Sequence, residues 1–182
     1  MIRAIGLVEF SSIAKGIEGA DAMLKSAQVE LLEAKPICPG KYIVLICGDV
    51  AAVQNAVDTG KTIGEDAVVD DFLLPNVHPH VIQAIALATE INGIKALGVI
   101  ETFSIASLIV AADAAAKAGD VDLIEIRIGM GIGGKSFVTL TGDVSSVKSS
   151  VEVGAALASE KGMLVNMVVI PSPHTSLKQS LL

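Results

Sequence analysis

Residues 4–34 read "AIGLVEFSSIAKGIEGADAMLKSAQVELLEA", and residues 96–126 repeat them without a gap as "ALGVIETFSIASLIVAADAAAKAGDVDLIEI". Fourteen of the 31 aligned positions are identical. Such self-similarity is the signature of a duplicated structural unit. The chain is therefore predicted to hold two related domains, at residues 1–92 and 93–182, with Asn92 and Gly93 as a natural stop between them.

Each copy carries the same predicted order of elements. An apolar strand at 3–9 is followed by Ser12, which can cap a helix whose apolar residues recur at helical spacing; Ser104 does the same in the second copy. The other predicted elements of the first copy are strands at 29–35, 42–47 and 67–75, a helix after Asp49, and an additional helix from Pro79 to about Glu90. The order β-α-β-β-α-β is a split β-α-β arrangement, so the predicted fold class is α+β, with two tandem ferredoxin-like domains.

The composition excludes several classes of protein. The formal net charge is −7 and no basic run stands out, which argues against a general nucleic-acid binder. Apolar runs stay shorter than the roughly 18 residues of a membrane-spanning helix. The first ten residues lack the pattern of a signal peptide, so we expect a cytoplasmic protein with no membrane partner. Two cysteines in such a protein are expected to be reduced thiols or metal ligands.

Residues 129–136, "GMGIGGKS", spell the phosphate loop of nucleotide-hydrolysing enzymes. That loop works only where a strand leads into a glycine-rich turn that opens a helix, because the helix N-terminus faces the phosphates. Here the residues from Phe137 to Thr141 favour a strand, and a helix cap comes only at Asp143. The matching place in the first copy, "KPICPGKY", has no such motif. We therefore predict a hairpin turn and no enzyme activity.

Several motifs resemble those of one known family. The duplicated unit, "ADAMLKSA" at 20–27, "GDVAAV" at 48–53, and "LPNVH" and "IPSPH" at 74–78 and 170–174 resemble the shell proteins of bacterial microcompartments. Two units in one chain resemble the tandem-domain class. "ICPGKY" at 37–42 and "GIGGK" at 131–135 are similar to its propanediol-utilisation T type. The resemblance covers nearly the whole chain.

The resemblance implies a structural role. Three tandem chains would form a flat pseudo-hexagonal homotrimer that tiles, with other shell proteins, into a facet of a microcompartment shell in the cytoplasm. The turn of the first copy would line the central axis, with Cys38 at that axis and Pro36, Ile37, Pro39 and Gly40 as the axis loop. Three copies of Cys38 would then hold one iron–sulfur cluster, of the 4Fe-4S type, for electron transfer across the shell. An encapsulated redox enzyme is a further partner that this implies.

Reasoning from the residues themselves leads to the same thiol. A cluster of this kind takes four cysteine ligands, whereas one chain has two cysteines. A three-fold axis multiplies one thiolate into three. Pro36 and Pro39 stiffen the turn around Cys38. The alternative is that Cys38 is an exposed turn thiol. Cys47 lies in the apolar strand "YIVLIC" and is expected to be a buried small hydrophobe.

The remaining ionisable residues have less specific interpretations. His78 and His80 are expected to cap the additional helix, and His174 is the counterpart of His78. Glu9 and Glu101 recur at the end of the first strand, where a surface or interface role is expected.

Two lysines recur on the first helix of each copy. Lys25 and Lys117 suit a solvated helix end, where a cation interacts favourably with the helix dipole. The resemblance implies instead that both lie at the tile edge and contact neighbouring tiles. The family's arginine in the closing segment is replaced by Asn76 and Ser172, so edge packing is expected to differ.

Two other functions stay open. One is a passive shell tile with a small metabolite pore at the axis and no cluster. The other is a soluble regulator that binds a small ligand, which would show no sheet-like assembly.

Overall fold

The computed structural model describes residues 4–129 and 131–181. These residues form two compact units. The first unit runs to Val77 and also takes in the turn from Gly129 to Gly134. The second unit consists of His78–Ile128 and the chain from Lys135 onward. No helix in the described part of the chain is both long and apolar enough to cross a membrane.

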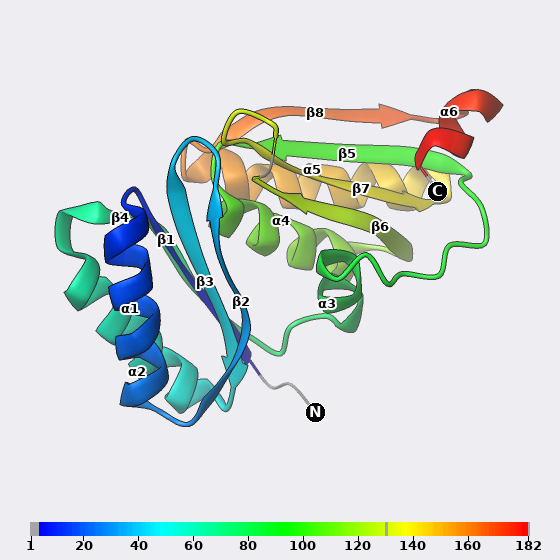
Figure 1. Ribbon diagram of the computed structural model, residues 1–182. Helices are drawn as coiled ribbons and strands as arrows, with labels where there is room; N and C mark the ends of the chain where they lie inside the picture. Colours follow the sequence, from blue (N-terminus) through cyan, green and yellow to red (C-terminus); the bar gives the residue numbers. More distant parts are fainter. Residues whose placement is uncertain (1–3, 130, 182) are drawn as a thin grey trace. The chain divides into compact units, whose positions relative to one another are not determined.

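The first unit is a four-stranded antiparallel sheet in the order β2-β3-β1-β4. Its elements are β1 (Ala4–Phe10), α1 (Ile13–Ser26), β2 (Val29–Ile37), β3 (Lys41–Gly48), α2 (Val50–Gly64), the short 3-10 helix η1 (Glu65–Ala67) and β4 (Val68–Pro75). Helices α1 and α2 both lie on one face of this sheet (Figure 1). The predicted split β-α-β arrangement is confirmed.

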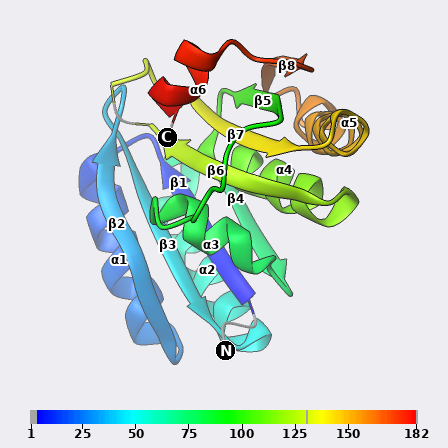
Figure 2. The ribbon, with the colours of Figure 1, turned by 90° about the vertical axis from the view of Figure 1, so that its right-hand side faces the viewer.

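The second unit repeats this topology with the strand order β6-β7-β5-β8. Its elements are α3 (Pro79–Ile85), β5 (Ala96–Thr102), α4 (Ile105–Ala118), β6 (Val121–Ile128), β7 (Ser136–Gly142), α5 (Val144–Glu160), β8 (Leu164–Ile170) and α6 (Thr175–Leu181). Helices α4 and α5 again lie together on one face of the sheet (Figures 1 and 2). Helix α3 belongs to this unit. The predicted domain boundary between residues 92 and 93 separates the two sequence repeats, and it stays a prediction.

Both long first helices begin as the sequence predicts. Ser12 is extended and its hydroxyl accepts a hydrogen bond from the Lys15 amide, and Ser104 does the same for Ser107. Asp49 occupies the cap position of α2 but makes no side-chain cap bond to it. The helix expected to reach Glu90 ends at Ile85. It ends early because Leu87 adopts a left-handed conformation, with φ of 53°, that an α-helix cannot contain.

Small residues let the helices approach the sheets closely. In the first unit, a β-carbon added to Gly16 of α1 would lie 2.4 Å from Cβ of Tyr42 on β3, so only glycine fits there. The core beneath α1 and α2 is aliphatic, with one phenylalanine and one tyrosine. Its fully buried members include Val8, Phe10, Met23, Val44, Ile46 and Val53. This packing fixes the sheet that carries the turn between β2 and β3.

Candidate functional site

The turn between β2 and β3 consists of Cys38, Pro39 and Gly40. The amide of Gly40 donates a hydrogen bond to the carbonyl of Ile37 at 3.0 Å, which closes the turn. Gly40 has φ of 83°, a left-handed conformation that favours glycine. The Cys38–Pro39 peptide bond is cis. The hydrogen bond of Gly40 thus closes a tight turn at the end of the β2–β3 hairpin, and Cys38 in this turn is partly exposed.

The other predicted loop residues divide between surface and core. Pro36, Pro39 and Gly40 are exposed, whereas Ile37 is buried with a 4% exposed fraction. The buried Ile37 side chain anchors the turn, because its removal from water stabilises this conformation over more open ones. Whether these residues line an axis depends on other copies of the chain, so that assignment stays a prediction.

A second turn, from Gly129 to Gly134, lies against the Cys38 turn within the first unit (Figure 1, yellow beside cyan). The Cys38 amide donates a hydrogen bond to the carbonyl of Gly129 at 2.9 Å. Strand β6 ends at Ile128 and strand β7 begins at Ser136, so the glycine-rich segment connects two strands. The phosphate-loop spelling therefore occurs without the helix that phosphate binding needs.

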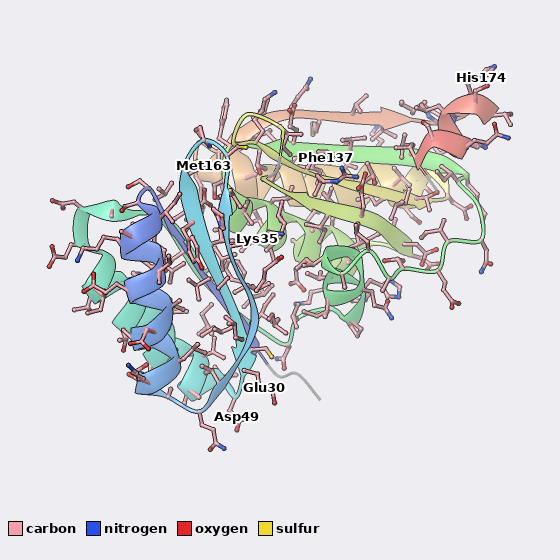
Figure 3. The ribbon with its side chains drawn as sticks, in the orientation of Figure 1. Glu30, Lys35, Asp49, Phe137, Met163 and His174 are labelled. Atoms are coloured by element: carbon pink, nitrogen blue, oxygen red, sulfur yellow. The ribbon has the colours of Figure 1, made fainter. Side chains whose placement is uncertain are left out.

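Cys47 is in a different environment. It lies on β3, with a 2% exposed fraction, as expected for a core cysteine. Burial raises the pKa of the Cys47 thiol, and the negative charge of Glu30 adds to this effect. Glu30 and Asp49 lie beside Cys47 around a surface cavity of about 590 Å³. Figure 3 shows both carboxylates at the end of the unit remote from the β2–β3 turn, so the two cysteines are far from sharing a site.

One chain does not form a metal site by itself in the part that the structure describes. Among residues 4–129 and 131–181, no three His, Cys, Asp or Glu side chains gather closely enough to hold a metal ion. Whether Cys38 binds a metal together with other chains stays a prediction.

Glu9 and Glu101 have a structural role that the sequence analysis missed. Glu9 is fully buried and forms an ion pair with Lys41 at the start of β3. Glu101 pairs with Lys135, just before β7, at 2.8 Å. Glu9 is therefore not the surface residue expected. The same carboxylate–lysine pair recurs in both repeats, a signal that aligning "GKY" with "GKS" could have revealed. Lys135 is thus engaged with Glu101.

The two lysines predicted at the tile edge each pair with an aspartate one helical turn earlier. Lys25 lies 2.6 Å from Asp21, and both side chains are more than half exposed. Lys117 lies 2.5 Å from Asp113, whose side chain is 4% exposed. The second oxygen of Asp113 accepts a hydrogen bond from the amide of His78 at 2.8 Å. Lys117 therefore neutralises a buried carboxylate that also accepts a hydrogen bond at the start of α3, whereas Lys25 lies in an exposed ion pair.

The histidines cap short helices, as predicted for His78. Its Nδ1 accepts a hydrogen bond from the amide of His80 at 3.3 Å, at the start of α3. His174 repeats this at the start of α6, where Nδ1 accepts from the amide of Ser176 at 3.2 Å. Burial lowers the pKa of the His78 imidazole, and the nearby His80 adds to the shift.

Comparison with known proteins places these features in a family. The family model for the BMC domain matches residues 4–77 and 96–173. The bacterial microcompartment shell protein PduT of Citrobacter freundii is 48% identical over 177 residues, which cover 97% of this chain and 96% of that protein. The microcompartment shell protein EutM of Salmonella typhimurium (strain LT2) is 42% identical over 86 residues, 47% of this chain and 86% of that protein.

A solved structure gives the same result. The crystal structure of a microcompartment protein from Desulfitobacterium hafniense DCB is 73% identical in sequence. It matches with a TM-score of 0.89 and covers 98% of this chain and 99% of that one. The resemblance drawn from the sequence motifs is confirmed by these matches. The chain therefore belongs to the BMC-domain family, as a bacterial microcompartment shell protein with two BMC domains in tandem, and its place is the microcompartment shell.

Proposed function

We propose that three copies of this chain form a pseudo-hexagonal homotrimer, a structural and non-enzymatic tile that packs with other shell proteins into facets. The support comes from an asymmetry between the two repeats. Helix α1 exposes a stripe of apolar side chains whose counterparts on α4 are buried. Ile13, Ile17 and Leu24 are 41%, 55% and 38% exposed, whereas Ile105, Ile109 and Ala116 are 0%, 0% and 6% exposed.

Apolar side chains that stay exposed along one face of a helix mark a surface that packs against another protein. A second copy of the chain can cover the α1 stripe. With two wedges per chain, three chains close a ring of six pseudo-equivalent units. The two units per chain and the exposed apolar stripe on α1 support the proposed trimer.

A charged substitution in the stripe tests the trimer. Ile17→Asp is expected to give monomers in light scattering, because burying an unpaired carboxylate in an apolar interface is costly. Val153→Asp on α5 is the matched control: Val153 is also exposed, and its counterpart in the first repeat is the polar Thr59. A monomeric wild-type protein at micromolar concentration, or equal effects of both variants, would contradict the proposal.

The trimer would also carry a metal site, with Cys38 of each chain as a ligand. The observation that carries this is the position of Cys38, partly exposed in a closed turn at the tip of the β2–β3 hairpin. A thiol there can reach other chains, whereas Cys47 is buried inside the sheet. Thiolate is the ligand that iron–sulfur clusters take, so one soft donor per chain fits a cluster shared by three chains.

When bound, a 4Fe-4S cluster supplies one-electron transfer, here across the shell to or from an encapsulated redox enzyme. The residues of this chain hold and restrict it. Cys38 supplies the thiolate, and Pro36 and Pro39 limit the conformations of the turn. Three Cys38 thiolates would supply three of the four ligands that such a cluster takes, and water or a group from outside the trimer would supply the fourth.

Anaerobic purification followed by assays of iron and sulfide tests the metal site. The wild-type protein is expected to be brown, and Cys38→Ser is expected to lose iron, sulfide and visible absorbance while remaining a trimer. Cys47→Ala is the matched control and should keep the cluster. A Cys38→Ser variant with full iron content refutes the assignment. A wild-type trimer without iron favours the passive tile with a pore, and a ligand-dependent melting shift without assembly favours the regulator.

A further inference from the structure

We infer that the Gly129–Gly134 turn is a clamp on the Cys38 turn, with Gly134 as a positioning residue for the Cys38 thiol. The expected effect of Gly134 on iron content rests on the proposed function, whereas its expected effect on the reactivity of the Cys38 thiol does not. If Gly134 positions the neighbouring turn without touching a ligand itself, the atoms of that turn should lie too close to Gly134 for any larger side chain.

The first contact of the clamp is between backbones. The amide of Cys38 donates to the carbonyl of Gly129 at 2.9 Å, and the amide of Gly40 donates to the carbonyl of Ile37 at 3.0 Å. The Cys38 turn is therefore fixed both internally and to the neighbouring turn. A hydrogen bond at the amide of the ligand residue limits rotation about the backbone that carries its thiol.

The second contact is the close approach of Gly134. This residue is buried, and its φ of +80° lies in the left-handed region. A β-carbon added there would lie 2.5 Å from Cδ of Pro39 and 3.0 Å from the carbonyl oxygen of Cys38. Both neighbours belong to the Cys38 turn, and the carbonyl is backbone that cannot swing away. An alanine at 134 must therefore displace the turn.

The same segment provides internal controls. Gly131 and Gly133 also have left-handed backbones, with φ of +73° and +65°, but both are exposed and a β-carbon on either meets nothing within 4 Å. Alanine at these positions brings a similar backbone penalty without the contact with Pro39 and Cys38. Any difference between Gly134→Ala and these two variants reports the clamp itself.

The experiment measures Cys38 directly in chains that carry Cys47→Ala, where Cys38 is the remaining cysteine. Metal is removed with a chelator, and the rate of reaction of the thiol with a disulfide reagent is followed. Gly134→Ala is expected to change this rate by about tenfold, in the range of coupled neighbouring residues. Gly131→Ala and Gly133→Ala should stay within about twofold of the parent. In untreated protein, iron content and cluster absorbance should fall with Gly134→Ala alone.

The comparison with Gly133→Ala separates positioning from general damage, because both variants place an alanine in a left-handed backbone but only position 134 lies against Pro39 and Cys38. Equal thiol rates in Gly134→Ala and Gly133→Ala would overturn the clamp, even if Cys38 binds a cluster. Wild-type protein without iron would refute the cluster and leave the thiol comparison to decide the clamp.

A measurement on the unmodified protein covers the case in which Gly134→Ala does not fold. The Cys38 amide should be protected from hydrogen exchange, because it is bonded to the carbonyl of Gly129. Exchange of this amide at the rate of an open loop would overturn the clamp.

Discussion

Replacing Lys117 should destabilise the protein far more than replacing Lys25, although the two lysines occupy the same position in the two repeats. Each pairs with the aspartate four residues earlier on its helix. The pairs differ in the exposure of the acid: the Asp21 side chain is 62% exposed and that of Asp113 is 4% exposed. Methionine is the suitable replacement, because it keeps most of the length of the side chain and removes the charge.

The expected magnitudes follow from this difference. An exposed pair one helical turn apart stabilises by about 0.3–0.5 kcal/mol, so Lys25→Met should have an effect of that size. Removing one partner from a fully buried pair costs about 3–5 kcal/mol. Lys117 itself is 42% exposed, and Asp113 keeps its hydrogen bond from the amide of His78, so the cost should be lower, at about 2 kcal/mol. In a chain of this length that corresponds to a fall of about 4–8 °C in Tm.

Urea unfolding of the wild type and both variants tests this, at one protein concentration because association is linked to stability. The Asp113→Asn/Lys117→Met double variant completes a double-mutant cycle, and it should be more stable than Lys117→Met alone because no buried charge is left. Equal shifts of the unfolding midpoint in Lys25→Met and Lys117→Met would refute the reasoning from burial.

Three further outcomes are expected. Lys135→Ala should cost less than about 1 kcal/mol, since its partner Glu101 is partly exposed, and equilibrium dialysis should detect no micromolar ATP or GTP binding in either protein. Lys25→Ala should leave the trimer intact but give smaller facets by electron microscopy, if this lysine contacts neighbouring tiles. Because the pKa of His78 is lowered in the folded chain, the unfolded chain takes up the proton first; stability should fall as the pH drops below about 6.5, and His78→Asn should flatten this fall in urea midpoints.

The fold was predictable because the duplication presents the sequence patterns of its helices and strands twice. The helix cap appeared in both copies, at Ser12 and Ser104, and so did the strand that follows the glycine and lysine of the turn, after Lys41 and after Lys135. Prediction was weaker for the additional helix from Pro79, whose counterpart α6 after the second copy was not predicted. The end of the helix at Ile85 depends on the left-handed Leu87, which no local sequence pattern indicates.

The sequence predicted only part of the candidate site. Cys38 and its flanking prolines are read directly from "KPICPGKY". Its contacts with Gly129 and Gly134 join residues about ninety positions apart, and only the folded chain brings them together. The burial of Asp113 was also hidden, because its counterpart Asp21 is identical in sequence and exposed in space. Identity between repeats predicts equal local structure but not equal surroundings.

The two turns of the duplicated chain are specialised in complementary ways, and sterics explain why. The first turn carries the thiol and two rigid prolines, whereas the second carries glycines at 129, 131, 133 and 134. In a trimer with Cys38 at the axis, three chains would bring twice as many turns as thiols, so a bulky second turn would compete with the ligands for the same space. A turn without side chains at its points of contact avoids this, and the buried Gly134 against Pro39 marks where such contact occurs. In the proposed trimer, duplication would let one copy keep the thiolate ligand while the small residues of the other copy's turn leave room for it.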